Sequence, residues 1–181
     1  MDFFKFEANF EDLTDIIIDE ADWFEDTIRQ DTIESQRETH TIHLVRAERE
    51  PGKVLANSDG LRIEDALYYK YQQVIEFIWN FADTYGGQIY RIAMVRLPPE
   101  KQVYPHYDGG TYYANKDRFH YVISGSYEMH VEEDFRIFNP GDLWWFDNKK
   151  IHHVKNISNT NRVAIIFDIK DSNWRQLASK R

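Results

Sequence analysis

A mainly β fold with flanking helices is predicted by two features of this 181-residue sequence. Short β-rich runs follow one another from residue 88 to residue 170, and turn residues such as Pro98-Pro99 and Asn139-Pro140-Gly141 separate them. Two segments with helical periodicity precede these runs. About eight short antiparallel strands are typical of a double sheet, so we expect a double-stranded β-helix, a jelly roll of cupin-like type, with the N-terminal helices packed outside.

Size and composition favour one folded domain over residues 1–181. Hydrophobic residues make up 42% of the chain and aromatic residues 15%, which is enough to build a core. The net charge of −9 argues against nucleic acid as a partner. The chain has no cysteine, no basic and apolar leader and no long apolar run. We therefore expect a soluble, cytoplasmic protein without membrane association, and the sequence leaves its oligomeric state open.

The N-terminal part, residues 1–87, is expected to be mainly helical with one strand. An amphipathic helix is predicted from Asn9, a possible N-cap, to about Gln30. Its apolar residues recur mostly three or four positions apart, at Leu13, Ile16, Ile17, Ala21, Phe24 and Ile28. The β-branched run 39–46 predicts a strand, on which His40 and His43 point to opposite faces and are poor candidates for a shared metal.

Turn residues between 48 and 62 predict a loop, and a second helix follows it. Gly86-Gly87 is a stop signal for this helix, whose apolar stripe comprises Leu67, Tyr71, Val74, Ile75, Ile78 and Ala82. The catalytic core of the jelly roll is expected over 88–170, with strands at 88–97, 102–107, 118–124, 126–132, 134–138, 142–147, 152–157 and 162–169. The remaining polar tail, 171–181, is expected to fray.

His106 and Asp108 are the first candidates for a metal site. They lie two residues apart, so on an extended strand both side chains project to the same side. A second imidazole from His152 or His153 would complete the two-His-one-carboxylate triad that leaves positions open on non-haem Fe(II). Strand parity leaves this choice open. A four-residue hairpin loop at 158–161 puts His153 on the face of Arg162, whereas another loop length or a bulge puts His152 there.

Two arginines are the candidates for binding an anion. Arg162 enters the apolar run VAIIFDI, where a guanidinium needs a planar partner such as the carboxylate of 2-oxoglutarate. Arg118 and His120 alternate onto one strand face. If that face is buried, Arg118 needs either an anionic ligand or an internal carboxylate.

In combination, these motifs resemble the aspartyl/asparaginyl β-hydroxylase-like Fe(II)/2-oxoglutarate dioxygenases. The resemblance covers roughly the C-terminal half and rests on His106-x-Asp108, Arg118-x-His120, the run 140–146 (PGDLWWF), His152-x-Val154-x-Asn156 and Arg162. It implies metal at His106, Asp108 and His152, 2-oxoglutarate at Arg162, and a co-substrate and substrate pocket lined by Arg118 and His120. The implied reaction hydroxylates an aspartyl or asparaginyl side chain in a protein, or a free amino acid.

Two other functions stay open. A cupin-like metal enzyme that does not use 2-oxoglutarate would share the fold without needing Arg162. A non-catalytic jelly-roll binding module would need no metal, because fold does not imply function. Arg118, as a second arginine, predicts a carboxylate-bearing substrate, either a small molecule or a peptide.

Overall fold

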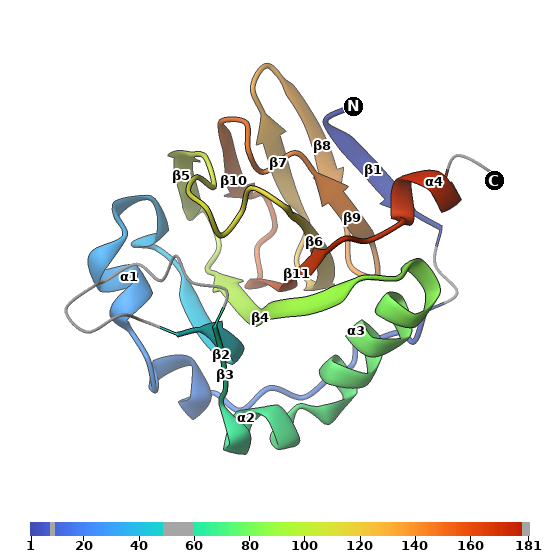
Figure 1. Ribbon diagram of the computed structural model, residues 1–181. Helices are drawn as coiled ribbons and strands as arrows, with labels where there is room; N and C mark the ends of the chain where they lie inside the picture. Colours follow the sequence, from blue (N-terminus) through green and yellow to red (C-terminus); the bar gives the residue numbers. More distant parts are fainter. Residues whose placement is uncertain (8–9, 49–59, 179–181) are drawn as a thin grey trace.

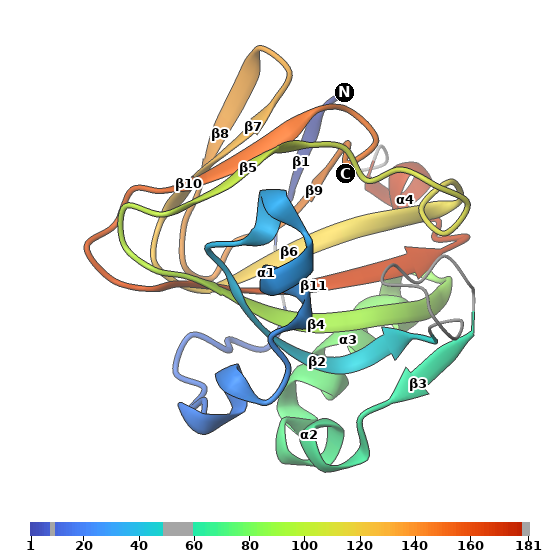
Figure 2. The same ribbon diagram turned by 90° about the vertical axis from the view of Figure 1, so that its left-hand side faces the viewer.

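Two antiparallel sheets face each other in the computed structural model, which describes residues 1–7, 10–48 and 60–178 (Figures 1 and 2). The large sheet has the order β1 (Phe3–Phe6), β9 (Leu143–Phe146), β6 (Lys116–Ser124), β11 (Arg162–Lys170), β4 (Gln88–Leu97), β2 (His40–Ala47) and β3 (Leu61–Ile63). The small sheet has the order β5 (Gln102–His106), β10 (His152–Asn156), β7 (Tyr127–Val131) and β8 (Asp134–Phe138). The predicted fold class, a mainly β double sheet of jelly-roll type, is confirmed.

The strands predicted between 88 and 170 all form, with ends that differ by at most two residues from the prediction. The described residues of the N-terminal part form three strands rather than the one expected, since β1 and β3 join the two edges of the large sheet. Leu61 and Arg62, expected in the loop 48–62, belong to β3, whereas residues 49–59 of that loop lie outside the described residues.

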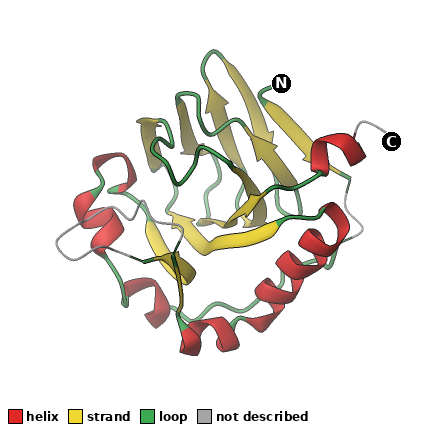
Figure 3. Ribbon diagram, viewed as in Figure 1, coloured by secondary structure: helices red, strands yellow, loops and turns green. Residues whose placement is uncertain are grey.

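The helical layer lies on the outer face of the large sheet (Figure 3). The predicted second helix forms as α2 (Asp65–Lys70) and α3 (Gln72–Tyr85), which are separated at Tyr71. Tyr71 is buried, and its hydroxyl donates to Asp22 and accepts from the backbone N–H of Asp19, so this residue leaves helical geometry to meet the preceding segment. The aromatic rings of α3 then pack into the outer core, where Phe81 contacts Phe6, Phe119 and Phe167.

The prediction of one long helix from Asn9 to about Gln30 is wrong. Asn9 lies outside the described residues, and the segment contains only the 3-10 turn η1 (Ala21–Phe24) and the start of the short helix α1 (Ile28–Thr32). Three aspartates explain the difference, because each accepts a hydrogen bond from the backbone N–H two residues ahead: Asp12 from Thr14, Asp19 from Ala21 and Asp26 from Ile28. Such local bonds compete with helical ones. The 3-10 turn η2 (Glu34–Gln36) follows α1.

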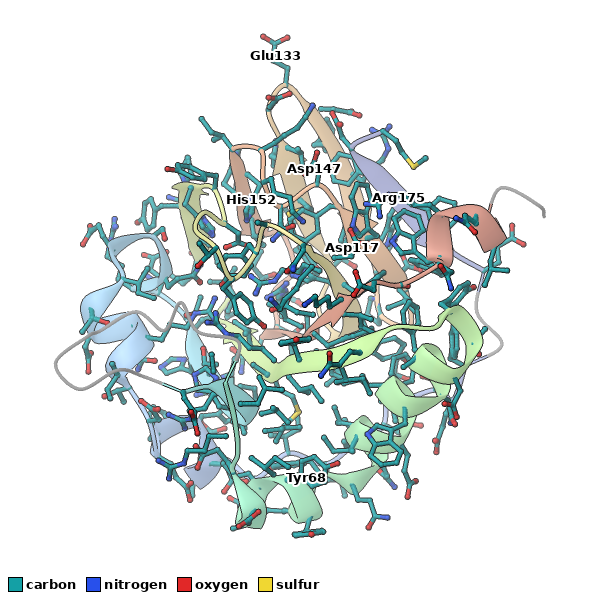
Figure 4. All side chains as sticks on the ribbon, in the orientation of Figure 1. Tyr68, Asp117, Glu133, Asp147, His152 and Arg175 are labelled. Carbon is teal, nitrogen blue, oxygen red and sulfur yellow. The ribbon has the colours of Figure 1, made fainter. Side chains whose placement is uncertain are left out.

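The polar tail predicted over 171–181 contains a short helix within its described part. Trp174 begins the helix α4 (Trp174–Ala178) and is fully buried, with its indole N–H donating to Asp117. Arg175 reaches the same carboxylate at 2.7 Å (Figure 4). Burial of a tryptophan outweighs the polar composition of the segment. No helix among the described residues combines the length and the apolar character needed to span a bilayer.

Candidate metal centre

The space between the two sheets is apolar at one end and polar at the other. The apolar end is a cluster that includes Leu97, Val122, Met129 and Phe138. By strand alternation, Arg118 and His120 of β6 share the inner face with Arg162 and Asp168 of β11. Asp168 lies opposite Arg118 towards the polar end, whereas Arg162 lies opposite Leu97, beside the apolar cluster. Polar side chains buried in such numbers need internal partners or a ligand.

Three candidate ligands meet at the polar end. His106 ends β5 and His152 begins β10, and the two residues lie opposite each other in the antiparallel pairing of these strands. Asp108 follows two residues after β5, where its backbone N–H donates to the carbonyl of Asn148. One ligand atom from each of His106, Asp108 and His152 lies within 4.8 Å of the other two. The structure therefore brings together the three residues that the sequence analysis selected.

Hydrogen bonds orient each of these side chains. The Nδ1 atoms of His106 and His152 donate to the backbone carbonyls of Tyr104 (2.8 Å) and Lys150 (2.9 Å), which makes the Nε2 lone pairs the metal-binding positions; the Gln36 amide contacts that of His106 at 3.2 Å. The Oδ2 atom of Asp108 accepts from Arg118 at 2.8 Å and from Asn148 at 2.9 Å. The Oδ1 atom of Asp108 faces His106 Nε2 at 4.0 Å.

The protonation states fit metal binding. Burial lowers the pKa of His106 and lowers that of His152 to about 4, so both imidazoles are neutral at pH 7, as ligation requires. Burial opposes the ionisation of Asp108, but the charge of Arg118, together with the hydrogen bond from Asn148 and the neighbouring histidines, outweighs it and lowers the pKa of this carboxyl. Two neutral imidazoles and one carboxylate form a donor set that suits Fe(II).

His153 points away from this centre. Its ring stacks on that of His130 with 4.2 Å between the centroids. The parity argument that favoured His153 assumed a hairpin between the strands of His152 and Arg162. Those strands, β10 and β11, belong to different sheets, so no hairpin pairing relates their faces.

The anionic partners of Arg118 are two carboxylates of the protein itself. It binds Asp108 through Nη1 and Asp168 through Nε at 2.8 Å and Nη2 at 3.0 Å. Burial works against its charge, but these two carboxylates hold the pKa of Arg118 well above its ordinary value. Of the two predicted roles for Arg118, the structure therefore contains the internal salt bridge. Arg118 still lines the cavity beside the candidate metal ligands.

Arg162, in contrast to Arg118, is buried without a carboxylate partner among the described residues. It is 1% exposed, and no carboxylate of the described residues forms an ion pair with it. Its guanidinium lies over the ring of Tyr127, with 4.1 Å from Cζ to the centroid, and its Nη2 lies 3.4 Å from Nδ1 of His120. Burial and the charge of Arg162 lower the pKa of His120 well below its usual value, so His120 is neutral.

Sequence reasoning missed several residues of this site. Asp168 shares the inner face with Arg162 by simple alternation, a signal that was available in the run VAIIFDI. Arg29 comes from the segment 9–30 that was predicted as a helix, and Gln36 follows it in a stretch for which no element was predicted. The Gln36 amide lies 3.2 Å from His106 Nε2. His40 and His43 face opposite sides as predicted, but His43 lines the cavity.

The sequence model of a family described as aspartyl/asparaginyl β-hydroxylase matches residues 54–172, which is more than half of the chain. No curated protein sequence matches the chain. Among solved structures, a predicted oxalate decarboxylase from Thermotoga maritima is similar, with a TM-score of 0.42 and 16% identity over 73% of this chain and 80% of that chain. The Cupin_2 domain of an XRE family transcriptional regulator from Enterobacter cloacae has a TM-score of 0.39 and 20% identity over 44% of this chain and 79% of that chain.

Proposed function

Since this chain belongs to the aspartyl/asparaginyl β-hydroxylase family, we propose that it is an Fe(II)- and 2-oxoglutarate-dependent dioxygenase that hydroxylates an amino-acid-type substrate. The observation that carries the proposal is a pair of features on the inner faces of the sheets. One is the three-residue donor set of His106, Asp108 and His152. The other is Arg162, a fully buried guanidinium that lacks a carboxylate partner within the described part of the chain.

His106, Asp108 and His152 would hold the iron. Bound Fe(II) together with 2-oxoglutarate supplies the oxidising power to insert an oxygen atom from O₂ into a C–H bond of the substrate, with succinate and carbon dioxide as the other products. The chain's own task is to fix the ligand atoms. The Tyr104 and Lys150 carbonyls set both imidazole tautomers, and Arg118 with Asn148 holds Oδ2 of Asp108, so that Oδ1 is left for the metal.

Arg162 would bind the distal carboxylate of 2-oxoglutarate. A guanidinium presents two parallel N–H groups to a carboxylate, and in a dry site this pairing is strong. Neutral His120 adds no second positive charge, and its ring packs edge-on against Phe146, at 4.9 Å between centroids. Phe146 in turn contacts the His152 ring, so an aromatic wall connects Arg162 with the metal ligands and excludes water.

Anaerobic titration with Fe(II) and 2-oxoglutarate tests the proposal, because the chelate has a visible charge-transfer band. We expect the band in the wild type and in His153→Ala, since His153 stacks on His130 away from the centre. His152→Ala should bind Fe(II) at least about 100-fold more weakly, because even changes around a ligand cost about 10- to 100-fold.

Equal metal affinity in His152→Ala and His153→Ala would contradict the assigned triad. Tight Fe(II) binding without any band, and without consumption of 2-oxoglutarate in air, would instead favour a cupin-like metal enzyme that uses a different co-substrate.

A further inference from the structure

A cavity of about 350 Å³ lies beside the metal triad and has two walls of different origin. The large sheet contributes Ala93, Arg118 and Ile166, and the segment 28–36, which comprises α1 and η2, contributes the opposite wall. Figure 2 shows α1 in front of the opening between the two sheets. His106 and Asp108 both line this cavity, so a molecule bound there lies next to the metal ligands.

The cavity is rich in positive charge. Arg29, Arg46, Arg91 and Arg118 line it, against the carboxylates of Asp108 and Asp168. Both carboxylates are already bound to Arg118, as described above. Arg46 is held at the rim by Asp26 and Glu64.

Aromatic side chains hold Arg91. Its guanidinium lies 3.6 Å from the ring centroid of Tyr112 and donates to the hydroxyl of Tyr113 at 2.9 Å.

Arg29 differs from the other arginines of this cavity. Its Nε atom is buried without a hydrogen-bond partner, as is that of Arg46, but its guanidinium has neither the ion pairs of Arg46 and Arg118 nor the aromatic contacts of Arg91 among the described residues. Burial lowers the pKa of Arg29, so its charge lacks the compensation that Arg118 receives from two aspartates. A guanidinium that faces a cavity in this state is suited to an anion that arrives with a ligand.

We propose that Arg29 binds a carboxylate of the substrate, which makes the substrate a small carboxylic acid of amino-acid size. This inference rests on the proposed function, because it places the substrate beside the iron ligands. The cavity volume lies at the lower end of the range for small-molecule sites, about 300 to 1,000 Å³. Ile28, Ile33 and Ile166 supply apolar contacts, and the Gln36 amide supplies a polar group next to His106.

Arg29 and Arg162 would thus serve different acids. Arg162 does not line this cavity and reaches the centre through His120 and Phe146, whereas Arg29 faces the cavity that His106 and Asp108 share. Arg29 also precedes the part of the chain that the family model matches, residues 54–172. The substrate contact would therefore come from a segment that the family pattern does not cover.

The test uses the full chain with Mn(II) in place of Fe(II) and saturating 2-oxoglutarate, so that the co-substrate site is filled. The common L-amino acids are screened by thermal shift, and each hit is titrated by calorimetry beside an analogue with a carboxamide in place of one carboxylate. We expect at least one acid to bind and its carboxamide to bind at least about tenfold more weakly. Arg29→Gln should bind the acid more weakly by the same factor, while its affinity for the carboxamide should not change. Arg29→Lys should recover part of the affinity for the acid.

The matched control is Arg136→Gln, since Arg136 is a half-exposed arginine paired with Asp134 on β8. This variant should bind the acid like the wild type. Circular dichroism and the melting temperature show whether Arg29→Gln folds. Unchanged acid affinity in folded Arg29→Gln would overturn the inference, as would a panel in which nothing binds the wild type.

A loss of 2-oxoglutarate affinity in Arg29→Gln would overturn the inference as well, by assigning Arg29 to the co-substrate. The same titrations without metal and 2-oxoglutarate separate the two proposals. If neither the wild type nor any variant binds metal or 2-oxoglutarate, but acid binding still depends on Arg29, the dioxygenase proposal fails and the acid site stands.

Discussion

Arg118 and Arg162 lie on neighbouring strands, face the same space between the sheets, and are 7% and 1% exposed. Their surroundings differ. Arg118 binds two aspartates, one of which is a candidate metal ligand. Arg162 has an aromatic ring and a neutral imidazole, and no carboxylate in the described ranges pairs with it.

The difference teaches that burial alone does not mark an arginine as a binding residue. A buried guanidinium with its carboxylates in place is part of the scaffold, and removing a carboxylate harms the fold. A buried guanidinium without a carboxylate weakens the fold, and its unpaired charge is suited to binding an external anion. In this chain, Arg118 positions Asp108, whereas Arg162 and Arg29 are suited to ligands.

The largest effect is expected where the scaffold arginine loses a partner. Asp168→Asn should lower the free energy of unfolding of the metal-free protein by about 3 to 5 kcal/mol, because it leaves Arg118 buried with one carboxylate fewer. Urea unfolding measures this change. Asp134→Asn is the control, since its pair with Arg136 is half exposed and contributes about 0 to 1 kcal/mol. Equal losses in the two variants would remove the distinction between the two arginines.

Arg162 should respond in the opposite way. Arg162→Met removes an uncompensated charge, so the free energy of unfolding of the ligand-free protein should stay the same or rise. The apparent dissociation constant of 2-oxoglutarate, measured with Mn(II), should rise at least about tenfold, and the affinity for Mn(II) itself should not change. Arg162→Lys should restore only part of the binding, because an ammonium lacks the planar fork. Undiminished 2-oxoglutarate binding in Arg162→Met would assign this arginine to the scaffold after all.

The sequence was sufficient for the part of the fold in which short-range rules operate. Alternation and turn residues predicted β4 and β8 to the residue. The same rules failed for residues 10–30, where the apolar residues have helical spacing but their side chains differ in burial. Leu13 is buried in the core, whereas Ile17 is 89% exposed.

For the site, the sequence predicted the ligands better than their surroundings. His106 and Asp108 follow from their spacing as candidate ligands, whereas His152 follows only from the motif order on which the family resemblance rests. The pairing of Arg118 with Asp168 joins residues 50 positions apart, so it depends on which strands are neighbours in the large sheet. The contribution of Arg29 and Gln36 depends on how the segment 28–36 folds over the cavity, and strand periodicity holds no information about that.

The smallest expected effect is a change in the pKa of His120 when the charge of Arg162 is removed. Burial is the main cause that lowers the pKa of His120, and the charge of Arg162 is the second. Because this pKa lies below the unfolded value of 6.5, the neutral His120 contributes stability above pH 6.5 that is lost as the pH falls towards the folded pKa.

NMR titration of the imidazole signals, assigned with His120→Asn, should show His120 neutral through the mildly acidic range in the wild type. In Arg162→Met the pKa of His120 should rise but stay below 6.5, since burial remains, and the acid-induced loss of stability should shrink. A pKa of His120 that is the same in both proteins would mean that Arg162 is already neutralised, and the external anion would no longer be needed to explain it.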